Sequence, residues 1–190
     1  MKNPILNGKK VYLRDLVYDD LFGDYFQWLN DEEVTRYTYI GREPNSIEKM
    51  KAYYQAVALS DNNALFAIID RGTDKHIGNV RLGPIHPVHR NANFGILIGN
   101  KNFWGKGYAS ESMRLVVEYA FAQLNVHKIN LGVVAHNSVA SSLYERVGFR
   151  LEGCARGNFR YDDKFLDCLY MGYLRDDYLK TKKTSSSGIA

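Results

Sequence analysis

Apolar residues recur along the chain with two periods, one typical of strands and one typical of helices. Alternation of apolar and polar residues predicts strands, whereas apolar residues at i, i+3 and i+4 predict helices. The strands are expected at residues 11–16, 64–70, 76–82, 93–99, 128–134, 150–156 and 165–173, and the helices at residues 19–29, 46–57, 109–124 and 138–146. This order predicts an α/β (α+β) domain, with a mixed sheet of about seven strands and about four helices.

Local signals mark where several of these elements begin and end. Asp19 or Asp20 can cap the first helix and Ser46 the second, because short polar side chains accept hydrogen bonds from first-turn amides. Residues 71–74 form a turn with a glycine between two strand patterns, which predicts an antiparallel hairpin. Gly148 follows the fourth helix, where a glycine C-cap is expected.

Length and composition exclude several classes of protein. The 190 residues are 45% apolar and 24% charged, which fits one folded domain and excludes extended disorder. No apolar run approaches the ~20 residues of a membrane span, and the start shows no signal peptide, so we expect a cytoplasmic protein. We place the domain at residues 1–179 and a flexible polar tail at residues 180–190, where lysines run into threonine and serine.

Charge and cysteine content narrow the choice further. The net charge of +4 is too small to predict nucleic-acid binding, but it is compatible with an anionic ligand. The two cysteines, Cys154 and Cys168, predict neither a disulfide scaffold nor a zinc module, and we expect no metal. Neither has a histidine close in sequence, so we do not expect a nucleophilic cysteine.

Residues 102–111 carry the strongest chemical signal, between a predicted strand and a strongly periodic helix. Gly105 and Gly107 let the backbone turn tightly and bring bare N–H groups close to a ligand. The start of a helix adds unpaired donors and a positive dipole end, which together favour a phosphate. The spacing fits neither a P-loop nor, with Ser110 at its third position, a dinucleotide fingerprint. An ordinary Gly-rich turn is the alternative.

Two motifs occur in the order and spacing of a known family. Gly107 and Ala109 match Arg/Gln-x-x-Gly-x-Gly/Ala, with Trp104 in place of the arginine or glutamine. Residues 137–149 match Asn-x-x-Ala-x-x-x-Tyr-x-x-x-Gly-Phe. Over roughly residues 10–179 the chain therefore resembles the GNAT superfamily of N-acetyltransferases, in particular the branch of ribosomal-protein alanine and spermidine acetyltransferases.

The resemblance implies a splayed, mostly antiparallel sheet that binds acetyl-CoA without a metal. The pyrophosphate would bind the Gly-rich loop, and the pantetheine arm would pair with a strand edge. The cofactor-binding residues that it implies are Leu97, Ile98, Trp104, Gly105, Lys106, Gly107, Tyr108, Ala109 and Asn137. It implies Tyr144 as the general acid that protonates the thiolate leaving group.

The general base has several candidates. An amine must lose a proton before it attacks the thioester. Many members of the family carry a glutamate where this chain has Asn93, and an amide cannot accept that proton. The alternatives are an ordered water, the histidines His86 and His89, and the carboxylates Asp31, Glu32 and Glu33.

The resemblance implies direct acetyl transfer to a primary amine and leaves the amine open. A protein N-terminus, a polyamine and an amino-sugar nucleotide all fit the branch. Tyr37, Tyr39 and the positive net charge favour an amino-sugar nucleotide, whereas a polyamine requires several carboxylates together. A non-catalytic CoA-binding sensor on the same fold is a further alternative. A homodimer could form through residues 169–173.

Overall fold

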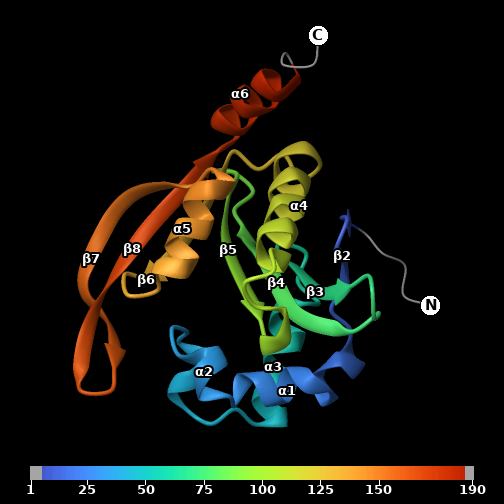
Figure 1. Ribbon diagram of the computed structural model, residues 1–190, viewed down its shortest axis with the longest axis vertical. Coiled ribbons are helices and arrows are strands. Elements are labelled where there is room, and N and C mark those ends of the chain that lie inside the picture. The colour runs from blue at the N-terminus through green and yellow to red at the C-terminus, as the bar shows by residue number, and fades with distance from the viewer. Residues whose placement is uncertain (1–5, 187–190) are drawn as a thin grey trace.

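The computed structural model describes residues 6–186, without the side chains of residues 42, 185 and 186. Eight strands form one sheet in the order β1-β2-β3-β4-β5-β6-β8-β7 (Figure 1). Their bounds are β1 Leu6–Asn7, β2 Val11–Asp15, β3 Ala64–Asp70, β4 His76–Ile85, β5 Asn91–Ile98, β6 Lys128–Val134, β7 Arg150–Tyr161 and β8 Lys164–Leu174. The predicted mixed α/β class is confirmed. The eighth strand is β1, which is too short for alternation to reveal.

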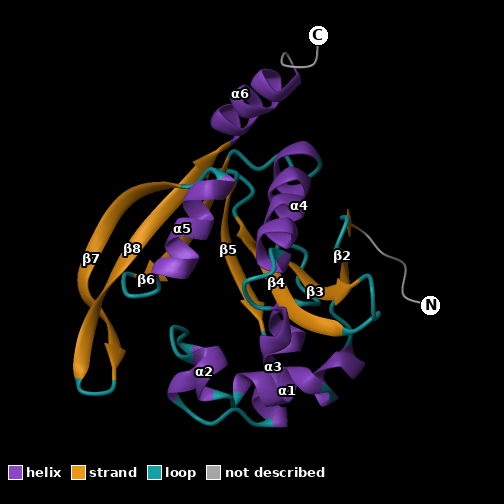
Figure 2. Ribbon diagram, viewed as in Figure 1, coloured by secondary structure: helices purple, strands orange, loops and turns teal. Residues whose placement is uncertain are grey.

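Six α-helices and three short 3-10 helices surround the sheet in the described chain. The α-helices are α1 Asp24–Leu29, α2 Glu32–Thr35, α3 Ile47–Val57, α4 Tyr108–Ala122, α5 Ser138–Val147 and α6 Arg175–Ser186. The 3-10 helices are η1 Tyr18–Phe22, η2 Ile40–Arg42 and η3 Lys101–Phe103. Figure 2 shows α4 and α5 lying in front of the sheet, with α1, α2 and α3 grouped at its lower end. None of the described helices has the length and apolar character that a membrane span requires.

Strand β3 is apolar from Ala64 to Ile69 because it is buried on both faces. Phe66 and Ile68 belong to the core that lies under α4 and α5. Leu65, Ala67 and Ile69 belong to a second core with residues of α1 and α3. Successive side chains of a strand point to opposite faces, so one continuous apolar run serves two cores.

The sheet opens between β5 and β6. These strands run parallel and are paired at Asn91 with Lys128, Ala92 with Ile129 and Asn93 with Asn130. Strand β6 then continues antiparallel to β8 as far as Val134. From residue 94 onward, the edge of β5 that faces β6 has no strand partner in the described chain. The implied splay of the sheet is therefore present.

The predicted cap of the first helix is wrong. Asp19 and Asp20 lie inside η1, and Gly23 is the N-cap residue of α1. The carboxylate of Asp20 instead accepts hydrogen bonds from the backbone N–H of Val17 at 2.8 Å and from Arg14 at 2.7 Å. Arg14, a buried residue of β2, shares this carboxylate with Val17, and local sequence does not reveal that contact.

Two other predicted helix ends are confirmed. The Ser46 hydroxyl accepts a hydrogen bond from the Lys49 N–H at 3.2 Å. Gly148 ends α5 with a φ of +125°, and a Cβ there would lie at 2.5 Å from Cζ of Tyr173. Both the backbone conformation and the close approach of a ring therefore require glycine.

Residues 180–186, which composition assigns to a flexible polar tail, form the second half of α6. The Tyr178 ring packs at 5.2 Å from the Phe121 ring of α4, and Lys182 forms an ion pair with Glu118. These contacts join segments that are more than fifty residues apart, so composition could not reveal them. Residues 187–190 of the expected tail lie outside the described residues.

We expect Asp20→Asn to lower the free energy of unfolding by about 3 kcal/mol at pH 7, since it leaves Arg14 buried without its charge partner. Burial alone would raise the pKa of Asp20, but the hydrogen bonds from Arg14 and Val17 outweigh it and lower that pKa below its ordinary value. The ion pair therefore stabilises the wild type above about pH 4 and is lost as the pH falls further. Urea unfolding at pH 7 and pH 3 measures both effects.

The matched control is Asp19→Asn, because Asp19 is exposed on the same 3-10 helix. This variant should stay within about 0.5 kcal/mol of the wild type. Equal losses in the two variants would contradict a specific role of the buried ion pair.

Candidate functional site

The loop before α4 is shaped by two glycines. Gly105 has a φ of +69° and Gly107 a φ of +85°. This left-handed conformation is disfavoured for residues that carry a Cβ. A Cβ at Gly105 would meet no atom within 4 Å, so the loop presents bare backbone to open space.

The start of α4 carries an unbroken run of unpaired donors. Between residues 105 and 110, no backbone N–H donates to an oxygen atom of the described chain. Helices α2, α3 and α5 differ, because the side chains of Asp31, Ser46 and Asn137 cap them. Helix α4 has 15 residues and the uncapped Gly107 at its start. Unpaired N–H groups and the positive end of the helix dipole together form an anion site.

Trp104 ties this loop to the end of β5. Its indole Nε1–H donates to the carbonyl oxygen of Ile98 at 2.7 Å. The side chain of this residue therefore points back to the strand rather than along the loop. The strand exit is fixed further by Gly99, where any side chain would collide with the ring of Trp28 from α1. The two segments that resemble a cofactor site thus form one connected unit.

Three contacts that the sequence analysis missed brace the same loop. The Lys10 ammonium donates to the Lys106 carbonyl oxygen at 2.8 Å, and the Lys10 N–H donates to Glu111 at 2.8 Å. The Tyr108 hydroxyl donates to Asp70 at 2.9 Å. Lys10 is 96 residues from Lys106 in the chain, so no spacing rule connects them.

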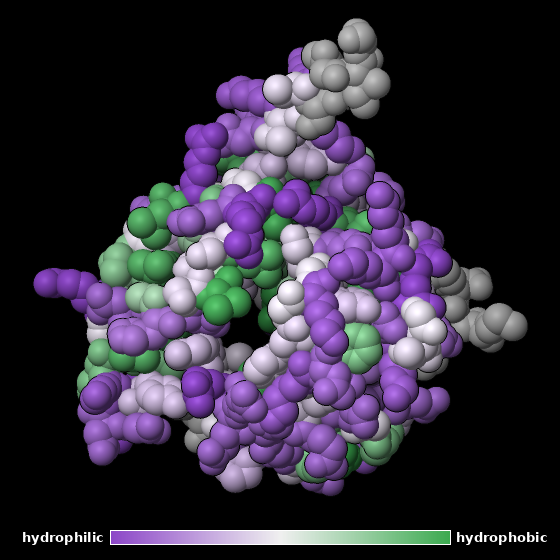
Figure 3. Space-filling view, viewed as in Figure 1, coloured by the Kyte–Doolittle hydropathy of each residue, from purple (hydrophilic) through white to green (hydrophobic). Residues whose placement is uncertain are grey.

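The second half of β5 borders the opening in the sheet. Leu97 packs against the core of α1 and α3, and Ile98 packs against the core under α4 and α5. Figure 3 shows the molecular surface hollowed between the lower part of β5 and the β7–β8 hairpin, above α2. A free strand edge beside a hollow can pair with an extended ligand that carries amide groups.

Tyr144 lies across the opening from this edge. Its ring is 6.0 Å from the ring of Phe149, which in turn is 6.2 Å from Phe94 of β5. Burial raises the pKa of Tyr144 to about 12. Within the described chain its hydroxyl has no hydrogen-bond partner, and at neutral pH it is a protonated donor. Asn137 lies about two helical turns before Tyr144 and caps α5, because its side-chain oxygen accepts a hydrogen bond from the Ala140 N–H at 3.2 Å.

The face of β5 opposite Phe94 carries the side-chain amide of Asn93 and, at Gly95, open space where a side chain would lie. Asn93 is exposed, and a Cβ at Gly95 would meet no atom within 4 Å. Arg81 is the partner of Gly95 on β4, and its guanidinium is held by the Asn63 side chain at 2.8 Å. An open surface beside a cation and a carboxamide therefore lies next to the free edge.

Two of the candidate carboxylates meet a lysine that follows β5. Lys101 forms ion pairs with Asp31 at 2.8 Å and with Glu33 at 2.9 Å. The hydrogen bond from Lys101 lowers the pKa of Asp31, which makes this carboxylate a weak base. Glu32 is exposed and belongs to neither ion pair. The structure therefore places two of the three carboxylates near the end of β5, and their charge is partly neutralised.

The candidate histidines lie at the other end of β5. His86 and His89 precede Asn91, and the seven steps from there to Ile98 span about 23 Å. The His86 ring nitrogen accepts hydrogen bonds from the N–H groups of its own loop, at 3.1 Å from that of His89. The structure therefore places both histidines away from the Leu97–Ile98 end of β5.

Cysteine and metal chemistry find no support in the described residues. Cys154 and Cys168 are free thiols, and burial raises the pKa of Cys168, which keeps its thiol protonated. Residues 6–186 contain no group of three or more His, Cys, Asp and Glu side chains that could hold a metal ion.

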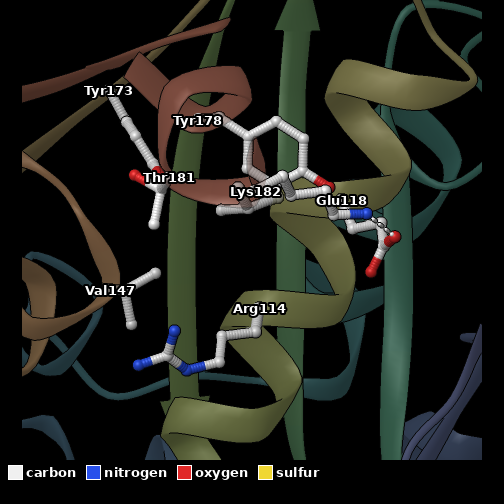
Figure 4. Close-up of a pocket in the computed structure, with 8 residues that line it drawn as sticks. Arg114, Glu118, Val147, Tyr173, Tyr178, Thr181 and Lys182 are labelled. Carbon is white, nitrogen blue, oxygen red and sulfur yellow. Dashed lines mark hydrogen bonds and ion pairs between the residues drawn. The ribbon is translucent and has the colours of Figure 1, made fainter. Parts of the chain in front are cut away.

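A separate cavity of about 210 Å³ lies between α4, α5 and α6 (Figure 4). Arg114, Glu118, Val147 and Tyr178 contribute to its walls. Arg114 is about 10 Å along α4 from the Gly-rich loop, and the Glu118–Lys182 ion pair closes the far side. The cavity is therefore separate from the Gly-rich loop, and none of its lining residues belongs to β5.

Comparison with known sequences agrees with this geometry. The sequence model of the acetyltransferase (GNAT) domain matches residues 10–150. This chain belongs to the GNAT acetyltransferase family. The resemblance found in its two motifs is confirmed, and the protein is an N-acetyltransferase.

Spermidine acetyltransferases are among its relatives. The spermidine N(1)-acetyltransferase of Escherichia coli is 30% identical over 179 residues, which cover 94% of this chain and 93% of that protein. The enzyme of Vibrio cholerae is 31% identical over 151 residues, which cover 79% of this chain and 85% of that protein. A crystal structure of spermidine N-acetyltransferase from Vibrio cholerae in complex with CoA and spermine matches with a TM-score of 0.82 and 30% identity, covering 90% of this chain and 99% of that chain.

We expect Gly107→Ala to weaken CoA binding at least tenfold. The left-handed backbone costs about 1–2 kcal/mol for a residue with a Cβ, and the loop relaxes by turning its N–H groups away from the ligand. Isothermal titration calorimetry with CoA measures the dissociation constant. Gly153→Ala on β7 is the matched control, because a Cβ there meets no atom within 4 Å. Unchanged affinity in Gly107→Ala would contradict the loop's role.

Proposed function

We propose that this GNAT enzyme transfers the acetyl group of acetyl-CoA directly to a primary amine, and that polyamines are its main acceptors. The observation that carries the proposal is the run of unpaired N–H groups at residues 105–110 beside the free edge of β5. An extended thioester with a diphosphate at one end satisfies both sets of backbone groups.

Each segment implied by the resemblance has a role in this proposal. The N–H groups of residues 105–109, which include Lys106 and Ala109, bind the diphosphate. The edge at Leu97 and Ile98 pairs with the pantetheine arm, and a backbone N–H there stabilises the developing negative charge on the thioester oxygen. Asn137 lies beside the arm at the start of α5. Trp104 holds the loop against the end of β5 through its hydrogen bond to the Ile98 carbonyl oxygen.

Tyr144 is the proposed general acid. When the amine nitrogen attacks the thioester carbon, the carbon–sulfur bond breaks and the sulfur leaves as a thiolate. The Tyr144 hydroxyl donates its proton to this thiolate. A pKa of about 12 keeps the hydroxyl protonated until the thiolate forms. Solvent then returns the proton to the tyrosine.

A water is the proposed acceptor of the amine proton. Asn93 occupies the strand position where a glutamate base is common in the family, and its amide can hold a water but cannot itself accept the proton. Asp31 is bound to Lys101 and has a lowered pKa. His86 lies at the far end of β5. The water would occupy the open space beside Gly95.

The relatives and two carboxylates support a polyamine acceptor. Spermidine acetyltransferases cover nearly the whole chain at about 30% identity. Asp31 and Glu33 stand close to Lys101, three residues beyond the end of β5. A protonated polyamine nitrogen can replace the Lys101 ammonium between these carboxylates, because both cations make the same charge-assisted hydrogen bonds.

An amino-sugar nucleotide is the second candidate acceptor. Arg81 lies beside the open position at Gly95 and can attract an anionic group. The aromatic residues Tyr37 and Tyr39 pack near the β7–β8 hairpin, with the Tyr39 ring at 5.2 Å from that of Phe159. This pair offers a stacking surface for a planar or sugar face. The sequence analysis favoured this acceptor, and the comparisons favour the polyamine.

We expect Tyr144→Phe to lower kcat about 100-fold with little change in the dissociation constant of CoA, since the ring stays and the acidic proton is lost. Because the pKa of Tyr144 is about 12, ionisation of this group should not lower the wild-type rate between pH 7 and 10. Stopped assays of CoA release across that range test both points. Tyr170→Phe, at an exposed tyrosine of β8, is the control and should keep full activity.

We expect spermidine to give a kcat/KM at least tenfold above that of an amino-sugar nucleotide or a peptide with a free N-terminus. The reason is the carboxylate pair, which stabilises a second positive charge of the acceptor. CoA release measured with each acceptor at saturating acetyl-CoA tests this order. A higher kcat/KM for the amino-sugar nucleotide would contradict the polyamine proposal and identify the amino-sugar nucleotide as the better acceptor.

The carboxylates themselves provide a variant and a matched control. Asp31→Asn combined with Glu33→Gln should raise the KM for spermidine about tenfold and leave the KM for acetyl-CoA unchanged. Asparagine preserves the cap of α2, since its side-chain oxygen can still accept from the Glu33 N–H. Glu32→Gln, on the same turn, should change neither constant.

A further inference from the structure

We propose that Lys10 is a positioning residue for CoA, which holds the phosphate-binding loop in its binding conformation. The inference rests on the proposed binding of the CoA diphosphate at the start of α4. Lys10 lies in the turn between β1 and β2, outside both motifs of the family. It reaches the loop only because the fold places that turn against α4.

The backbone of Lys10 is fixed by α4 itself. Glu111, in the first turn of that helix, accepts hydrogen bonds from the N–H groups of Lys10 at 2.8 Å and Val11 at 3.4 Å. The turn is closed by a hydrogen bond from the Gly8 N–H to the Val11 carbonyl oxygen at 2.9 Å. A side chain at Gly8 would collide with the Glu111 carboxylate. The turn and the helix therefore fit closely, and the Lys10 side chain starts from a fixed position.

The ammonium of Lys10 then pairs with the loop. It donates to the Lys106 carbonyl oxygen at 2.8 Å and lies 3.6 Å from the position that a Cβ of Gly107 would occupy. In a trans peptide the C=O and the following N–H point in opposite directions. Binding the Lys106 carbonyl on one side therefore turns the Gly107 N–H toward the other side, where the remaining unpaired donors are available to a phosphate.

Charge adds to this geometric effect. The Glu111 carboxylate lies in the first turn of α4, where it would weaken the attraction of the helix start for a phosphate. The Lys10 ammonium, beside Lys106 and Gly107, offsets that negative charge within the same few residues. Glu111 and Lys10 thus act as a pair, in which the carboxylate positions the lysine and the lysine restores a positive potential at the loop.

The experiment compares ligands that differ in their phosphates. Calorimetric titrations use CoA, 3′-dephospho-CoA, which keeps the diphosphate, and pantetheine, which has no phosphate. Lys10→Ala should weaken binding of CoA and of 3′-dephospho-CoA by the same factor of about ten, and leave pantetheine unchanged. Lys10→Arg should restore affinity to within threefold of the wild type. The control is Lys9→Ala, because Lys9 is the exposed neighbour on the same turn, and it should bind all three ligands normally.

Two results would overturn the proposal. Unchanged affinity of Lys10→Ala for 3′-dephospho-CoA would show that the lysine has no part in diphosphate binding. An equal loss for pantetheine would show a general disturbance of the site rather than an effect on the loop, and the midpoint of urea unfolding would identify it. Because the titrations contain no acceptor amine, they stay informative if every tested amine fails. Absence of CoA binding to the wild type would instead contradict the proposed function.

Discussion

Backbone N–H and C=O groups must find partners, and this protein leaves two sets of them unpaired in one place. One set is the edge of β5 after residue 93, and the other is the start of α4. The indole of Trp104 joins them through the Ile98 carbonyl. Water can satisfy these groups in the free protein. A ligand that carries both amides and phosphates can instead form hydrogen bonds with both sets at once. The acetyl donor of the GNAT family has that chemical character.

Much of the remaining structure keeps these groups exposed. Strand β6 pairs with β5 over only three residues, whereas its other edge pairs with β8 along its whole length. The rings of Phe94, Phe149 and Tyr144 pack in a row that links β5 to α5 across the splayed strands. Glu111 could have capped its own helix, but it bonds to the turn before β2 instead. The site is therefore a product of packing on both sides of the sheet.

The sequence predicted what local rules determine. Alternation located the long strands, Ser46 and Gly148 marked helix ends, and the pattern of residues 138–146 predicted α5. Contacts between distant segments were not predictable in this way. Arg14 pairs with Asp20, Tyr178 docks the polar C-terminal helix, and Lys10 meets a loop almost a hundred residues away.

The residues proposed to bind the acceptor amine were likewise not predictable as a group from the sequence. Composition could count carboxylates, but it could not show that Lys101 sits between Asp31 and Glu33. Nor could it show that Arg81 is the β4 partner of Gly95. In the proposed function, selectivity among amines depends on the distances between these charges. The packing of η3 against α2 sets the distances between Lys101, Asp31 and Glu33, and no single motif encodes it.

The contact of Trp28 with Gly99 has a consequence for local unfolding. Helix α1 has six residues, and such a short helix is held by its packing rather than by its own hydrogen bonds. The ring of Trp28 from this helix nevertheless packs directly against Gly99, where β5 passes into the Gly-rich loop. Opening of α1 is therefore expected to loosen that loop while the sheet is still intact. In the proposed function, binding of the acetyl donor at that loop is therefore expected to slow hydrogen exchange of the α1 amides.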